Sequence, residues 1–93
     1  MKMAREIMGK AKRDTCTLDS LKEGSRSQVV SVTGDTHLRR RLLEMGFCNG
    51  ATVEVISRAP LGDPVEYKIR GYRLSLRREQ ASHVHMAKLA SGT

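Results

Sequence analysis

One stretch of the chain, residues 36–50, combines a helical pattern with a helix stop. Leu38, Leu42 and Met45 recur at positions i, i+4 and i+7, so they share one stripe of a helix. Gly46 suits the left-handed conformation that commonly ends a helix. The sequence therefore predicts one helix of about three turns that buries one face.

The start of this helix and its outer face also follow from the sequence. Asp35 or Thr36 can cap the first turn by accepting a hydrogen bond from a backbone N–H. Arg39, Arg40 and Arg41 fall largely off the apolar stripe. The outer face of the helix is therefore predicted to be cationic.

Strands are predicted on both sides of the helix. Residues 27–33 are rich in β-branched side chains, which favour a strand with Val30 and Val32 on one face. Residues 52–58 alternate as a half-buried strand requires, although Ile56 falls on the solvent face. The helix is thus expected to divide one run of strands from the next.

The clearest hairpin joins residues 65–70 to residues 73–77. Its loop is predicted at residues 71–72, because a glycine at the first position of a two-residue loop suits a type II′ turn. That register places Ile69 opposite Leu74 on the buried face.

The number and spacing of these elements predict the fold class. After the hairpin, residues 78–81 indicate a single helical turn and residues 82–86 a last strand. Five or so short strands with one short α-helix favour a mainly β fold, a small SH3-like antiparallel β-barrel, with an OB-like barrel as the alternative. We expect a basic, flexible extension at residues 1–15, the barrel at residues 16–86 and a flexible tail at residues 87–93.

Charge and composition narrow the classes of function. The 93-residue chain has a formal net charge of +7, which attracts nucleic acid, anionic lipid or an acidic protein. One Phe and two Tyr leave few platforms on which single-stranded bases could stack. No apolar run is long enough to span a bilayer, and the two cysteines show no C-x-x-C spacing. We therefore expect a cytoplasmic protein with reduced thiols.

Few residues in the sequence indicate catalysis or metal binding. No nucleophile and base form a recognisable pair and no glycine-rich phosphate loop is present, so we expect no enzyme, no catalytic residues and no cofactor. His83 and His85 lie two apart on a predicted strand and can begin a site for iron, zinc or nickel. No third ligand is assignable, and two surface histidines are the simpler interpretation.

Two segments are candidates for binding a partner protein. The helix arginines can form bidentate bonds to phosphates or carboxylates, although a solvated helix face is the alternative and Glu44 can neutralise one of them. The loop at residues 59–64 offers Leu61 between rigid prolines, although a simple connector is the alternative. The candidate partner-binding residues are Arg39, Arg40, Arg41, Pro60, Leu61, Gly62, Asp63 and Pro64.

Four motifs occur in one order along residues 17–86. They are Leu18-x-x-Leu21-x-x-Gly24, Arg41-Leu42-x-x-Met45-Gly46-Phe47-x-x-Gly50, Ala59-Pro60-x-Gly62-Asp63-Pro64 and Gly71-Tyr-Arg-Leu-Ser-Leu-Arg77. In these motifs the chain resembles the FeoA family, the small ferrous iron transport protein A. The basic stretch before Thr17 lies outside the pattern.

The resemblance implies an SH3-like barrel that acts beside the membrane ferrous iron transporter FeoB, which has a GTP-binding domain. It implies a cytoplasmic binding accessory and not an enzyme. Our hypothesis is that the chain binds the cytoplasmic part of FeoB, peripheral to the inner membrane, and modulates its GTPase or transport activity. The alternatives are a small β-barrel that binds nucleic acid and a carrier that binds ferrous iron or another transition metal directly. Self-association through exposed Ile56 is a further alternative.

Overall fold

The computed structural model describes residues 15–87. The strands are β1 (Thr15–Thr17), β2 (Arg26–Val32), β3 (Thr52–Arg58), β4 (Val65–Ile69), β5 (Tyr72–Leu76) and β6 (Val84–Ala87). The helical segments are the 3-10 helix η1 (Leu18–Ser20) and the α-helices α2 (Thr36–Glu44) and α3 (Arg78–Ala81). The strands form one antiparallel sheet in the order β1-β6-β2-β3-β4-β5. The predicted mainly β fold is confirmed.

Most of the two predicted terminal segments lie outside residues 15–87. Apart from Thr15, the extension predicted at residues 1–15 lies outside the described residues, and so does the predicted tail apart from Ala87. None of the helices within residues 15–87 is long and apolar enough to cross a membrane.

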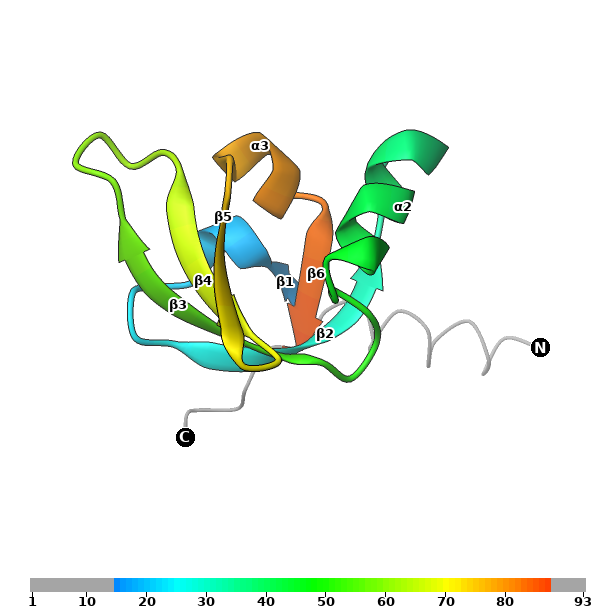
Figure 1. Ribbon diagram of the computed structural model, residues 1–93, viewed down its shortest axis with the longest axis horizontal. Helices are drawn as coiled ribbons and strands as arrows, with labels where there is room; N and C mark the ends of the chain where they lie inside the picture. Colours follow the sequence, from blue (N-terminus) through cyan, green and yellow to red (C-terminus); the bar gives the residue numbers. More distant parts are fainter. Residues whose placement is uncertain (1–14, 88–93) are drawn as a thin grey trace, which may run out of the picture.

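Strand β2 joins the two halves of the sheet, because its first residues, 26–28, pair with β3 and its later residues, 29–32, pair with β6. The register shifts between Val29 and Ser31, and such a bulge kinks a strand and increases its twist. The bend folds the two halves of the sheet toward each other, with α2, α3 and the loop between β3 and β4 along the upper side (Figure 1).

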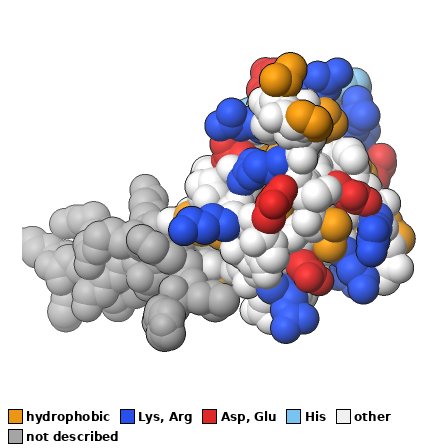
Figure 2. Space-filling model, turned by 90° about the vertical axis from the view of Figure 1, so that its left-hand side faces the viewer, with side chains coloured by type: hydrophobic (Ala, Val, Ile, Leu, Met, Phe, Trp, Pro, Cys, Tyr) orange, Lys and Arg blue, Asp and Glu red, His pale blue; other side chains and the backbone are white. Residues whose placement is uncertain are grey.

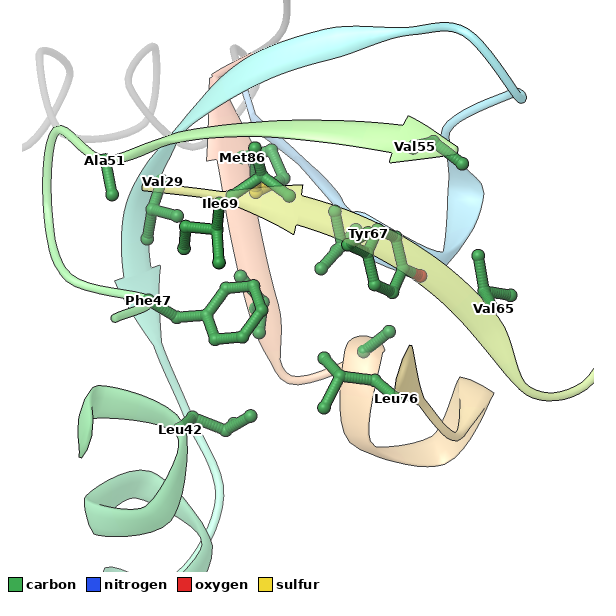
Figure 3. Close-up of a cluster of buried hydrophobic side chains, with 14 residues drawn as sticks. Val29, Leu42, Phe47, Ala51, Val55, Val65, Tyr67, Ile69, Leu76 and Met86 are labelled. Carbon is green, nitrogen blue, oxygen red and sulfur yellow. The ribbon is translucent and has the colours of Figure 1, made fainter. Parts of the chain in front are cut away.

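The folded sheet encloses one apolar core. Tyr67 and Phe47 are the largest fully buried side chains, and apolar side chains from both halves of the sheet surround them (Figure 3). The core consists of Leu18, Val29, Leu42, Phe47, Ala51, Val53, Val55, Val65, Tyr67, Ile69, Leu76, Ala81, Val84 and Met86.

Helix α2 confirms the predicted helix and both of its ends. The carboxylate of Asp35 accepts a hydrogen bond from the backbone N–H of Leu38 at 2.8 Å, so Asp35 is the cap. Leu42 is fully buried, and Gly46 has a φ of +108°, in the left-handed region. The buried stripe therefore joins α2 to the core.

The predicted orientation of the β2 valines is wrong in part. Val30 and Val32 were expected on one face, but Val30 is 37% exposed whereas Val32 is half-buried and packs against the core. The bulge between Val29 and Ser31 accounts for the difference, since an extra residue reverses the alternation beyond it. Ile56 lies at a similar register shift in β3 and is half-buried instead of fully exposed.

The predicted hairpin exists, but its predicted loop and register are wrong. The loop consists of Arg70 and Gly71, whose φ values of 49° and 86° are both positive, as a type I′ turn requires. Ile69 consequently pairs with Tyr72 and not with Leu74. The shift amounts to two residues, so the apolar side chains keep their predicted face.

Candidate partner-binding surface

The loop at residues 59–64, hereafter the proline loop, presents one apolar side chain to solvent. The N–H of Gly62 donates to the carbonyl oxygen of Ala59 at 2.7 Å, and the N–H of Ala59 donates to that of Pro64 at 3.0 Å. Leu61, at the tip, is 95% exposed. The proline loop therefore holds Leu61 outward on a hydrogen-bonded base.

Hydrogen bonds to other elements fix the proline loop in place. The carboxylate of Asp63 accepts from the backbone N–H of Arg78, the first residue of α3, at 2.9 Å. The backbone N–H of Arg58 donates to Glu23 at 2.7 Å, and the Arg58 guanidinium donates to the carbonyl oxygen of Leu21. Asp63 thus holds the loop against α3, and the loop offers a partner mainly apolar contact.

The outer face of α2 combines cationic and apolar groups. Arg39, Arg40 and Arg41 are all exposed, as predicted from the sequence. Leu43 is 46% exposed beside them. A shallow hollow on this face is lined by Thr36, Arg39, Arg40, Leu43 and Glu44. A partner side chain there would meet Leu43, two guanidinium groups and one carboxylate.

The structure does not bring the two candidate segments into contact. In Figure 1 the proline loop lies at the upper left, α2 at the upper right and α3 between them. Figure 2 faces the end that carries the proline loop and shows apolar side chains at its top, with Lys, Arg, Asp and Glu mixed below. A partner that engages both segments must span this side of the molecule.

The solvent face of the sheet is less cationic than its positive charges suggest. One cross-strand row places Arg26 opposite Glu54, Glu54 opposite Lys68 and Lys68 opposite Arg73. Arg73 also forms an ion pair with Glu66 at 3.9 Å. These carboxylates interrupt the cationic row, which weakens the case for a nucleic acid backbone as the ligand of this face.

His85 lies in β6, His83 directly precedes this strand, and both side chains are half-buried. Each places a ring nitrogen near the hydroxyl of Thr33. Within residues 15–87, no group of three or more His, Cys, Asp or Glu side chains is arranged to hold a metal ion.

Comparison with known proteins identifies the family. The family model of the FeoA domain matches residues 16–88. The chain belongs to the FeoA family. A relative from Porphyromonas gingivalis, a fusion of Fe(2+) transport protein A with the Fe(2+) transporter FeoB, is 43% identical over 74 residues. The match covers 80% of this chain but only 9% of the fusion protein.

Solved structures of FeoA proteins share the fold. The solution structure of FeoA from Chlorobium tepidum superposes with a TM-score of 0.73 at 40% identity, over 80% of this chain and 70% of the other. FeoA from Stenotrophomonas maltophilia, solved with zinc and described as a prokaryotic SH3 domain protein, gives a TM-score of 0.67 at 30% identity, over 75% and 87% of the two chains. The predicted SH3-like fold is confirmed for this FeoA chain.

Leu43 is an exposed apolar residue on the outer face of α2 that the sequence prediction missed. It follows Leu42, which occupies the buried stripe of α2, so its own position falls beside the arginines. An apolar residue off the buried stripe of an amphipathic helix was the available signal.

Proposed function

We propose that this chain is a cytoplasmic accessory protein of bacterial ferrous iron uptake, which binds the transporter FeoB and modulates its GTPase or transport activity. The observation that supports this role best is the Porphyromonas gingivalis relative, in which FeoA and FeoB are parts of one polypeptide. Fusion keeps two parts at a high effective concentration, which is useful when one part acts on the other. The Stenotrophomonas maltophilia protein is described as a candidate activating factor of ferrous iron transport, in line with the same role.

In this proposal the proline loop and the outer face of α2 bind FeoB. Leu61 supplies apolar area that is now almost entirely in water, and Leu43 adds a second apolar contact. The α2 arginines attract an acidic surface from a distance and set the orientation of the encounter. The chain binds and regulates in this role, and it catalyses no reaction itself.

A titration against the soluble GTP-binding part of FeoB tests the proposal. Saturable binding that differs between the GDP-bound and GTP-bound forms, together with a changed rate of GTP hydrolysis, is the expected result. Binding to full-length FeoB but not to its soluble part would place the contact on the membrane part. Failure of the folded chain to bind full-length FeoB in any nucleotide state would overturn the proposal.

A Leu61→Asp substitution should weaken FeoB binding by about ten- to a hundredfold. Burial of a leucine side chain contributes roughly 1.5–3 kcal/mol, and a carboxylate placed in the same contact resists desolvation. Leu61 is 95% exposed in the free protein, so its replacement should leave the urea denaturation midpoint unchanged. Gln28→Asp, at an exposed position of β2, is the matched control for added negative charge. Unchanged FeoB affinity in the folded Leu61→Asp protein would remove the proline loop from the interface.

Replacement of Arg39, Arg40 and Arg41 by glutamine should slow association with FeoB and remove most of its salt dependence. Glutamine keeps a high helix propensity, so α2 should persist, while the long-range attraction is lost. Stopped-flow association rates at several salt concentrations measure the effect. The control is Arg26→Gln with Arg73→Gln, which removes two charges from the sheet face. An equal loss of salt dependence in the control would mean that net charge, and not α2, steers the encounter.

A further inference from the structure

Two imidazole rings converge on one hydroxyl group at the junction of β6 and the end of β2. Nδ1 of His83 lies 3.3 Å from Oγ1 of Thr33, and Nε2 of His85 lies 3.2 Å from the same oxygen. Strand β6 lies between β1 and β2 in the sheet, so strand pairing on both sides holds the backbone of His85. His83 directly precedes β6, and its N–H donates to the carbonyl oxygen of Gln80 at 3.1 Å. The two ring nitrogens therefore face a common point from a rigid element.

The contacts that now hold the rings are easily replaced. The backbone of Thr33 is anchored, because its N–H donates to the carbonyl oxygen of His83 at 2.8 Å. The Thr33 hydroxyl can donate one hydrogen bond, and it lies within reach of both imidazoles and of the carbonyl oxygen of His83, which is at 3.3 Å. These three separations lie at or beyond the upper end of the usual ranges, about 3.2 Å between nitrogen and oxygen and about 3.0 Å between two oxygens, so each contact is weak. A stronger ligand for the two nitrogens could displace the hydroxyl at small cost.

Gly34 leaves room beside the ring of His83. A Cβ atom at Gly34 would lie 3.3 Å from Nδ1 of His83 and 3.0 Å from the side chain of Leu38. Since no such atom is present, the coordinating edge of the imidazole is not covered from that side. The space is adjacent to the nitrogen that would bind a ligand.

We propose that His83 and His85 together bind a late first-row divalent cation such as Zn²⁺, Ni²⁺ or Cu²⁺, with water completing the coordination. Imidazole nitrogen suits these ions, and their affinity for a given nitrogen site exceeds that of Fe²⁺. Within residues 15–87 no carboxylate or thiolate joins the pair to form a three-ligand group, so hard cations such as Mg²⁺ and Ca²⁺ are disfavoured. The site is thus a modest-affinity, zinc-type site and does not rest on FeoB binding.

Calorimetric titration with ZnCl₂ and, without oxygen, with FeCl₂ tests the proposal. We expect one Zn²⁺ per chain and weaker binding of Fe²⁺. Loss of an outer-sphere partner typically costs about tenfold or more in metal affinity, so removal of a ligand by His83→Ala or His85→Ala should cost at least as much. Two matched controls, His37→Ala and Cys48→Ser, should leave the affinity unchanged.

Nuclear magnetic resonance of the imidazole groups in the unmodified protein makes the test independent of folding in the variants. Zn²⁺ should shift the ring signals of His83 and His85 and leave those of His37 in place. Unchanged Zn²⁺ affinity in a folded His83→Ala, His85→Ala double variant would assign the binding to other residues and overturn the proposal. Absence of any ring shift at about 1 mM ZnCl₂ would overturn it as well. At that concentration a site with a binding free energy of roughly −4 kcal/mol is half occupied.

Discussion

Replacement of Phe47 by alanine should lower the free energy of unfolding by about 3–5 kcal/mol, the usual cost of removing a buried aromatic ring. Phe47 is 0% exposed and is one of the two largest fully buried side chains. Its ring lies between α2 and the sheet, where apolar neighbours from both surround it (Figure 3). Small domains have total stabilities of roughly 5–15 kcal/mol, so the variant should be close to unfolding at 37 °C. Urea denaturation followed by circular dichroism measures the change.

The effect is large because the end of α2 delivers Phe47 into the core. The N–H of Phe47 donates to the carbonyl oxygen of Leu42 at 3.1 Å, and the N–H of Gly46 donates to that of Leu43 at 3.0 Å. This pair of bonds is the Schellman motif, which requires the left-handed residue that Gly46 supplies. The matched control is Leu43→Ala on the exposed side of the same helix. It should lower the free energy of unfolding by well under about 1 kcal/mol. Similar losses in both variants would contradict the assignment of Phe47 as a principal core residue.

The same segment was the most predictable part of the fold. Its helix period, its capping Asp35 and its terminal Gly46 are local signals, and each of them has a local physical cause. The structure confirms all three. The sequence was therefore sufficient to predict the backbone conformation where neighbouring residues alone determine it.

The hairpin shows why other details could not be predicted. Two loops are compatible with the sequence, one of Gly71 with Tyr72 and one of Arg70 with Gly71, and both place the apolar residues on the same face. The Tyr72 hydroxyl donates to the carbonyl oxygen of Met45, at the end of α2, in the register that the structure adopts. That contact joins segments far apart in the chain, so no local pattern could reveal it.

The sequence predicted which residues of the candidate site are exposed, but not how those residues are placed relative to one another. Leu61 and the α2 arginines are exposed, as their local patterns indicated, but their role in binding FeoB stays a prediction. The separation of the proline loop from α2, with α3 between them, depends on the bend in β2 (Figure 1). The convergence of His83 and His85 on Thr33 also depends on strand pairing between β2 and β6. Such pairings are long-range and leave no trace in the spacing of single residues.

Stability should fall between about pH 10 and pH 12 because of one buried tyrosine. Burial raises the pKa of Tyr67 from 10.0 to about 12. In that window the folded chain keeps the phenol proton while the unfolded chain loses it, so the free energy of unfolding decreases as pH rises. Two pKa units correspond to a loss on the order of 2–3 kcal/mol, complete once the pH passes the folded-state value. The contribution is fully present below pH 10, where both states are protonated.

A Tyr67→Phe substitution should remove this part of the alkaline destabilisation, because phenylalanine has no proton to lose. The Tyr67 hydroxyl makes no hydrogen bond to any residue of the described range, so its removal should cost little stability at pH 7. Urea denaturation midpoints from pH 8 to pH 11.5 for both proteins give the difference directly, since lysine and arginine titration is common to both. Tyr72→Phe is the matched control: Tyr72 is 44% exposed, and the fall in stability with pH should persist when it is replaced. If the stabilities of the wild-type and Tyr67→Phe proteins fell in parallel across this window, the buried phenol would not be the group that links folding to alkaline pH.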